Sequence, residues 1–173
     1  MEELIKFATI DTLTGIFNRR EFFEQAQLIL EKDQQWEKKF SFMLLDFDHF
    51  KNINDTYGHS CGDYVLQTMA KTISQKLPDD GIFGRVGGEE FAIILSDSSI
   101  KKAHEYAEEL RAYVEKKELS YEGHKFHISV SIGVTEYNSK DKDIKDVFKE
   151  ADKLLYKAKE SGRNCVCVEQ TQK

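Results

Sequence analysis

The sequence has few of the residues that mark secreted, zinc-binding or membrane-spanning proteins. Of its 173 residues, three are cysteine and one is proline. Cys61, Cys165 and Cys167 form no Cys-x-x-Cys pair, so a zinc site is not expected, and their low, odd number favours reduced thiols and a cytoplasmic setting. The longest apolar runs, 43–45 and 91–95, are too short to cross a bilayer, and no signal peptide precedes them. We therefore expect no membrane segment in this chain, even if it belongs to a larger, membrane-attached protein.

The length and net charge of the chain further narrow the class of protein. Hydrophobic residues make up 40% of the chain, which is enough for one core, and the length suits one domain. The 25 basic residues against 31 acidic ones give a net charge of −6. Proteins that bind nucleic-acid polymers need a positively charged surface, so we do not expect a nucleic-acid polymer as the main partner.

Apolar spacing predicts an alternation of helices and strands. Three- and four-residue steps predict helices over 22–30, 66–77, 100–114 and 147–158, with Gly162 ending the last. Apolar or alternating runs predict strands over 40–46, 81–86, 91–95, 126–134 and 164–168. This order predicts an α+β fold, in which helices flank one mainly antiparallel sheet. It fits the βαββαβ core of ferredoxin-like and polymerase-palm folds.

Two groups of acids lie where a sheet exposes side chains to ligands. Residues 46–48 (Asp-Phe-Asp) end a buried strand, and Glu89 and Glu90 follow two glycines in a predicted hairpin turn. If the strands are neighbours, Asp46 and Glu89 meet, and two such carboxylates would suit Mg²⁺. The alternative is that these acids are merely solvated. The glycines either form a turn or let a phosphate approach the backbone N–H groups.

Two further polar clusters are each open to a structural or a functional interpretation. The segment 50–63 is rich in Asn and Asp, which together can bind the edge of a purine, or which can simply cap helices. Lys159 and Arg163 lie four residues apart at the end of the last predicted helix. They can bind phosphate, or they can favour the helix dipole alone.

Taken together, these clusters resemble the motifs of the GGDEF family, the diguanylate cyclases. The opening segment resembles the family's DxLTGLxNRR motif, the next its DxDxFKxxND motif, and RVGGEEF is the GGEEF form of the signature. The matching segments, in family order, are 11–20, 46–55, 58–63, 85–91, 131–133 and 151–164. Six spaced motifs in this order make a chance match implausible.

The resemblance implies a bacterial signalling enzyme that condenses two GTP into cyclic di-GMP and two pyrophosphates. Two domains would face each other as a homodimer, each holding one GTP, and a 3′-hydroxyl would attack the α-phosphate held opposite. We expect residues 11–168 to form the catalytic domain, 1–10 to end a connecting helix and 169–173 to be a polar tail. We also expect a sensory or dimerising domain before it in a longer protein.

The resemblance also implies roles for single residues. Mg²⁺, or Mn²⁺ in its place, would be bound by the side chains of Asp46 and Glu89 and the carbonyl of Phe47. Glu90 would help to deprotonate the 3′-hydroxyl, a role that Glu89 would share through the metal. The remaining residues would bind the nucleotide: Asn54 and Asp63 at guanine, with Phe50 and His59 nearby; Gly87 and Gly88 at the phosphates; Lys51, Lys159 and Arg163 as phosphate-neutralising cations.

The assignment of Asp63 predicts the base preference. A carboxylate accepts hydrogen bonds from guanine N1–H and N2–H₂, and adenine offers no such pair. We therefore expect GTP to be preferred over ATP.

The sequence departs from the family pattern at one regulatory site. Many members have an Arg-x-x-Asp product-inhibition motif, but Pro78 and Gly81 occupy those positions here. We expect no inhibition through that site. We also expect Cys61 to be a small packing residue rather than a redox switch.

Three alternatives to an active cyclase remain. One is a catalytically silent receptor for GTP or cyclic di-GMP, the second is a cyclase for another nucleotide, and the third is an interaction domain without a ligand. Asp46, Glu89 and Glu90 are all present, which favours activity over the silent receptor. Another nucleotide would need a different base-binding pair from Asn54 and Asp63.

Overall fold

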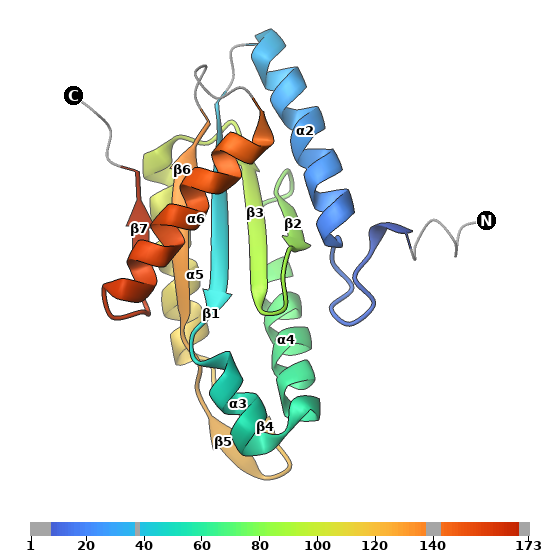
Figure 1. Ribbon diagram of the computed structural model, residues 1–173, viewed down its shortest axis with the longest axis vertical. Helices are drawn as coiled ribbons and strands as arrows, with labels where there is room; N and C mark the ends of the chain where they lie inside the picture. Colours follow the sequence, from blue (N-terminus) through green and yellow to red (C-terminus); the bar gives the residue numbers. More distant parts are fainter. Residues whose placement is uncertain (1–7, 37–38, 138–142, 170–173) are drawn as a thin grey trace.

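Helices cover both faces of a central sheet in the computed structural model of the chain (Figure 1). The structure describes residues 8–36, 39–137 and 143–169. The helices are α2 (Arg19–Trp36), α3 (Phe50–Tyr57), α4 (His59–Ser74), α5 (Ile100–Lys116) and α6 (Ile144–Glu160). Helices α2 and α6 lie on one face, and α4 and α5 on the other, whereas α3 lies beyond one end of the sheet (Figure 1).

The main sheet has five strands in the order β2-β3-β1-β6-β7. These strands are β1 (Phe40–Phe47), β2 (Ile82–Arg85), β3 (Glu90–Ser96), β6 (Val130–Glu136) and β7 (Val166–Val168). All neighbours are antiparallel except β6 and β7, which are parallel. The order β2-β3-β1-β6 is that of a βαββαβ core, so the predicted α+β fold with a mainly antiparallel sheet is confirmed.

Strand β1 is apolar on both sides because both faces of the sheet are covered. Phe42 and Leu44 pack in the core between the sheet and α2 and α6, whereas Met43 and Leu45 pack in the core on the opposite face. Side chains alternate along a strand, so Asp46 lies on the same face as Leu44, toward α6. The periodicity that builds the core therefore also directs the acid at the strand end.

The predicted strand over 126–134 is wrong in its extent. A short hairpin, β4 (Leu119–Tyr121) and β5 (His124–Phe126), ends before β6 begins. Glu122 and Gly123 form its two-residue turn, and both have positive φ (47° and 82°), as hairpin turns of this length favour. We did not predict this hairpin.

A helix pair occupies the segment in which we expected a polar cluster. Helices α3 and α4 are joined at Gly58, and α4 ends at Ser74, so the predicted continuation of this helix to Leu77 is wrong. The β4–β5 hairpin packs on this pair: the rings of Tyr57 and Phe126 stack 5.1 Å apart, and Tyr64 and Tyr121 lie 5.3 Å apart.

The chain ends are described in part. Residues 1–7 and 170–173, which contain most of the predicted connecting helix and polar tail, lie outside the described residues. Residues 8–9 are helical. Glu169, which we assigned to the tail, donates its backbone N–H to the Val134 carbonyl (3.1 Å) and accepts a hydrogen bond from the Thr135 hydroxyl (2.7 Å).

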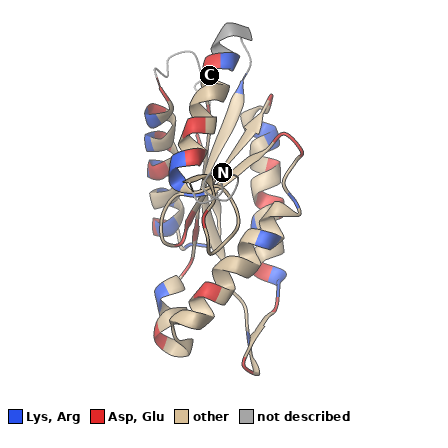
Figure 2. Ribbon diagram, turned by 90° about the vertical axis from the view of Figure 1, so that its right-hand side faces the viewer, with Lys and Arg blue, Asp and Glu red and all other residues tan. Residues whose placement is uncertain are grey.

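The surface carries charges of both signs. Basic and acidic residues are interspersed along the helices in Figure 2. No described helix is long and apolar enough to span a membrane. The three cysteines are free, and burial raises the pKa of the Cys61 thiol, which makes it less reactive.

Candidate active site

The end of β1 and the β2–β3 turn form one acidic edge of the sheet. Asp46 is the direct cross-strand partner of Glu90, so the two predicted acidic groups do meet. The Lys159 ammonium, from the last turn of α6, lies 2.8 Å from Asp46 Oδ2. Lys159, which we expected to bind phosphate, is therefore brought to this edge as an ion-pair partner of the predicted metal ligand.

Asp46 is poorly suited to hold its charge without a cation. Burial raises its pKa to about 6, and the charges of Glu89 and Glu90 push in the same direction. The hydrogen bond and charge of Lys159 oppose this rise without cancelling it. Three carboxylates this close together, at 46, 89 and 90, favour the binding of a further positive charge.

The β2–β3 turn carries the two glycines of the signature. The backbone N–H groups of Val86 and Gly87 donate to the Glu90 carbonyl, at 2.9 and 3.2 Å. A Cβ on Gly87 would lie 2.8 Å from Glu90 Oε2, so the Glu90 carboxylate packs over Gly87. A Cβ on Gly88 would meet nothing within 4 Å, which leaves that side of the turn open to a ligand.

Two arginines hold the carbonyls of this turn. Arg85 donates from Nε and Nη2 to the Gly88 carbonyl, at 3.0 and 2.8 Å. Arg19, at the start of α2, donates to the Val86 carbonyl at 2.6 Å. We assigned no role to either arginine, although both belong to the motifs that we recognised.

Asp11 completes the support of the turn. Its carboxylate accepts hydrogen bonds from Arg85 Nη1 (3.2 and 3.3 Å) and from the backbone N–H and hydroxyl of Thr14 (2.9 and 2.7 Å). Burial alone would raise the pKa of Asp11, but the Thr14 hydrogen bonds and the charge of Arg85 hold it below its ordinary value. Asp11 therefore stays ionised and fixes Arg85, which in turn fixes Gly88.

A pocket of about 410 Å³ opens beside the turn, between β2 and the α3–α4 pair. That volume is within the range of small-molecule sites. It is lined by Phe50, Lys51, Asn54, His59, Asp63, Leu66, Arg85, Gly88 and Glu89. All of these except Leu66 and Arg85 are residues that we predicted for the metal or the nucleotide. The pocket thus joins an amide and a carboxylate at one end to the glycine turn at the other.

Gly62 allows Asn54 and Asp63 to share this pocket. A Cβ on Gly62 would collide with Asn54 Oδ1 and would lie 3.1 Å from the ring of Phe50. The missing side chain lets the Asn54 amide lie against the first turn of α4, which carries Asp63.

The remaining predicted residues lie outside the lining of this pocket. Phe47 is buried, Gly87 lies in the β2–β3 turn, and Glu90 begins β3. Arg163 follows α6 with an exposed side chain and a positive φ of 64°. Among the described residues, no hydrogen bond or ion pair joins the Arg163 side chain to the other predicted residues.

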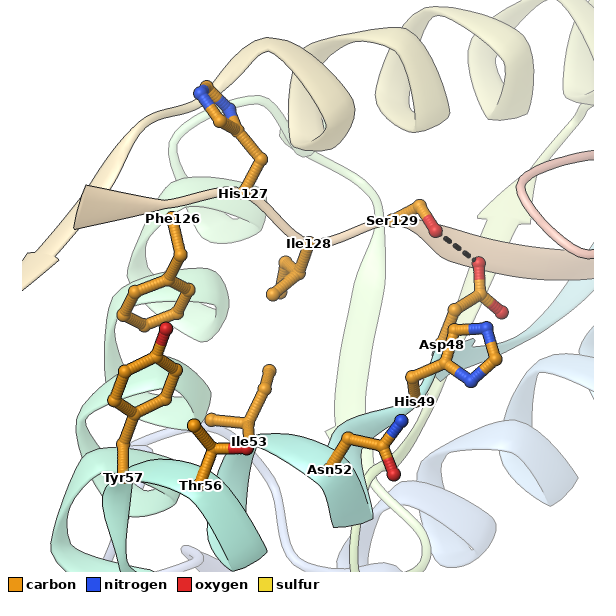
Figure 3. A pocket seen from close by; sticks show the side chains of 10 residues that line it. All are labelled: Asp48, His49, Asn52, Ile53, Thr56, Tyr57, Phe126, His127, Ile128 and Ser129. Atoms are coloured by element: carbon orange, nitrogen blue, oxygen red, sulfur yellow. Dashed lines mark hydrogen bonds between the residues drawn. The ribbon is translucent and has the colours of Figure 1, made fainter. Parts of the chain in front are cut away.

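A second, smaller pocket of about 290 Å³ is lined by other residues of α3 than the first, and Figure 3 shows its lining side chains. Asp48 is in its wall, where its carboxylate accepts a hydrogen bond from Ser129 (Figure 3). Ile53 and the paired rings of Tyr57 and Phe126 form its apolar part. We gave Asp48 no separate role, although it stands two residues after Asp46.

The donor set fits a hard divalent cation only in part. Within the described residues, no group of three or more His, Cys, Asp or Glu side chains is arranged to hold a metal. Two carboxylates and one carbonyl, as predicted, leave positions that Mg²⁺ ordinarily fills with water and substrate phosphates. The raised pKa of Asp46 is the observation that favours a cation here.

The comparison with protein families decides the classification. Residues 8–165 match the family profile described as "Diguanylate cyclase, GGDEF domain". The chain belongs to the GGDEF family. The resemblance drawn from the motifs is thereby confirmed.

Two relatives of this GGDEF domain are named as diguanylate cyclases. It is 38% identical over 172 residues to Diguanylate cyclase A of Treponema denticola, covering 96% of this chain and 46% of that protein. It is 35% identical over 167 residues to a diguanylate cyclase of Vibrio cholerae, covering 96% and 51%. The chain therefore spans about half the length of these curated relatives.

Solved GGDEF structures share the fold. The GGDEF domain of DgcB from Caulobacter crescentus, solved in complex with c-di-GMP, superposes with a TM-score of 0.90 at 32% identity, covering 93% of both chains. The active GGEEF domain of a Vibrio cholerae diguanylate cyclase has a TM-score of 0.83 at 34% identity, covering 90% of this chain and 98% of that one.

Proposed function

We propose that this domain is an active diguanylate cyclase that condenses two GTP into cyclic di-GMP. The observation that carries the proposal is the pocket in which Asn54 and Asp63 lie opposite Glu89 and the open glycine turn. One end offers groups that complement guanine, and the other offers backbone and carboxylate groups where phosphates and a cation would lie. The names of the relatives support the same reaction.

The pocket holds one GTP in this proposal. The Asp63 carboxylate accepts hydrogen bonds from guanine N1–H and N2–H₂, and the Asn54 amide binds a further edge of the base. Lys51 and Arg163 neutralise phosphate charge, and Gly88 lets the phosphates reach the turn. Lys159, now paired with Asp46, would shift toward the phosphates when a divalent cation takes its place at that carboxylate.

Asp46, Glu89 and the Phe47 carbonyl would hold Mg²⁺ or Mn²⁺. When bound, the cation would supply charge neutralisation at the α-phosphate and would lower the pKa of a nearby hydroxyl. Glu90 is the cross-strand partner of Asp46, and this position supports its proposed role as the group that accepts the proton.

The reaction needs a second domain. One pocket holds one GTP, so two domains must face each other as a homodimer. The 3′-oxygen of one GTP forms a bond to the α-phosphorus of the other, the bond to pyrophosphate breaks, and Glu90 takes the hydroxyl proton. Repeating the step in the opposite direction closes the ring. Catalysis here is mainly the positioning of two reactants.

The wider context is also part of the proposal. The relatives are about twice as long as the matched region, so we infer that a sensory or dimerising domain accompanies this domain in its natural protein. We infer a cytoplasmic location because GTP is found there. Pro78 and Gly81 form a turn after α4, and we still predict no product inhibition through that turn.

Incubation with GTP and Mg²⁺, followed by chromatography and mass spectrometry, tests the proposal. We expect cyclic di-GMP and pyrophosphate in a ratio of one to two. Glu89→Gln should bind GTP but form no product, whereas Glu105→Gln, which changes an exposed acid on α5, should retain full activity. A folded, dimerised protein that binds GTP without forming product would instead be a receptor.

A further inference from the structure

The carboxylate of Asp48 accepts three hydrogen bonds beside the proposed site. It is buried, with 5% of its surface exposed. Oδ1 accepts a hydrogen bond from the Ser131 hydroxyl (2.6 Å), and Oδ2 accepts from the Ser129 hydroxyl (2.6 Å) and the Asn164 backbone N–H (3.0 Å). The two hydroxyl-to-carboxylate distances lie at the short end of the range for O–H···O hydrogen bonds. Asp48 therefore joins the end of β1 to the start of β6 and to the turn after α6.

That turn has an unusual backbone. Gly162, Arg163 and Asn164 all have positive φ, at 108°, 64° and 47°. Glycine adopts such angles freely and asparagine tolerates them, but a long side chain such as arginine rarely does. A turn of this kind needs contacts that hold it in place.

Asn164 supplies those contacts through three bonds. In addition to its backbone N–H on Asp48, its amide donates to Glu115 Oε1 (2.7 Å) and accepts from Arg111 Nη1 (2.9 Å), both on α5. The turn is thus fixed from two sides, and Arg163 directly precedes the fixed Asn164 in the chain. The backbone N–H of Arg163 also donates to the Ala158 carbonyl (3.1 Å).

We propose that Asp48 is a positioning residue, which fixes the turn at 162–164 and so holds Arg163 in place to bind phosphate. The inference rests on the proposed function, because it takes Arg163 as a phosphate ligand. Asp48 itself is not among the residues that line the proposed nucleotide pocket. It acts through Asn164, whose position determines the direction of the arginine side chain.

The experiment compares phosphate-dependent with base-dependent binding. We would measure the affinity for α,β-methylene GTP with Mg²⁺, and for guanosine, in wild type, Asp48→Asn and Ser131→Ala. We expect Asp48→Asn to weaken binding of the triphosphate about tenfold, as loss of a charge-assisted contact does, and to leave guanosine binding within about twofold. Ser131→Ala keeps the carboxylate and should show a smaller loss in the same direction, so it serves if Asp48→Asn folds poorly.

Ser41→Ala is the matched control. Ser41 is buried at the other end of β1 and donates one hydrogen bond to the Ser98 carbonyl (2.8 Å). The Ser41→Ala variant loses a comparable buried hydroxyl hydrogen bond far from the turn at 162–164. It should therefore leave the ratio of the triphosphate affinity to the guanosine affinity unchanged. In an Arg163→Ala background, Asp48→Asn should weaken triphosphate binding no further, because the effect passes through Arg163.

Amide hydrogen exchange separates this inference from the proposed function. The Asn164 amide should exchange faster in Asp48→Asn than in wild type or Ser41→Ala, without any nucleotide present. An unchanged affinity ratio in Asp48→Asn and Ser131→Ala, in a wild type that binds the triphosphate, would overturn the role of Asp48 alone. So would an equal loss for guanosine, or an additive loss with Arg163→Ala. A wild type that binds no guanine nucleotide would overturn the proposed function, and this inference with it.

Discussion

Replacing Asp46 by Asn tests whether this carboxylate is destabilised in the folded domain. Burial and the neighbouring acids raise the pKa of Asp46 from an ordinary value of 3.8 to about 6. Between these two values the unfolded chain has released the proton and the folded domain has kept it. The folded state therefore loses stability as the pH rises from about 4 to 6, and the loss is complete above pH 6.

The size of the effect follows from the two pKa values. They differ by 6 − 3.8, or about 2 units, and each unit corresponds to about 1.4 kcal/mol, so Asp46 costs the folded state about 3 kcal/mol above pH 6. Asp46→Asn removes this titration. The free energy of unfolding of the variant, minus that of wild type, should therefore rise by about 3 kcal/mol between acid and neutral pH. The Lys159 ion pair needs no separate correction, because its effect is already contained in the wild-type pKa of Asp46.

Urea unfolding followed by circular dichroism, at several pH values from 3.5 to 8 and without divalent cations, measures this difference. Asp152→Asn, which removes a carboxylate on the exposed side of α6, is the control for the change in charge. A difference for Asp46→Asn that stays constant, or that falls as the pH rises, would refute the account of a destabilised acid at this edge.

Further predictions concern the pocket and its supports. Asp63→Asn should reduce the preference for GTP over ATP by roughly tenfold to a hundredfold, because a hydrogen-bonded charge at the base is lost; competition binding measures this, and an unchanged preference would contradict the assignment. Gly62→Ala should raise the KM for GTP about tenfold, because the new Cβ displaces the Asn54 side chain, and it should change the melting temperature little. A normal KM in a folded variant would show that Asn54 does not bind the base. Arg85→Ala should destabilise the domain by roughly 2 kcal/mol, since it leaves the half-buried Asp11 carboxylate without its cation, and it should also slow turnover. Urea unfolding and steady-state rates check both effects, and wild-type values would mean that the turn does not depend on this pair.

Local patterns in the sequence were sufficient for most of the sheet. The run at 40–46, which is apolar on both faces, indicated a central strand. The Gly-Gly turn indicated the hairpin of β2 and β3 at the acidic edge of the sheet. The β4–β5 hairpin escaped prediction because its turn uses Glu122 where Asn or Asp is the usual signal. The alternation that continues through 127–129 then concealed the break before β6.

The site was predictable where one motif supplies adjacent groups, and less so where support comes from a distance. Asn54, Asp63 and Glu89 were found because the family motifs contain them, and the fold brings them to one pocket. The roles of Arg19 and Asp48 depend on bonds to Val86 and to Asn164, across sequence separations of 67 and 116 residues. Spacing along a chain carries no signal for contacts of that range.

The most direct test of the central claim is the rate of cyclic di-GMP formation from GTP and Mg²⁺, measured over a wide range of protein concentrations. If two domains each contribute one GTP, the rate per mole of protein should rise with concentration, and a dimerising coiled coil fused before Met1 should remove that dependence and raise the rate at high dilution. Absence of product from the folded fusion protein, or a rate per mole that is the same at every concentration of the unfused domain, would contradict the account of a cyclase that works across two facing domains.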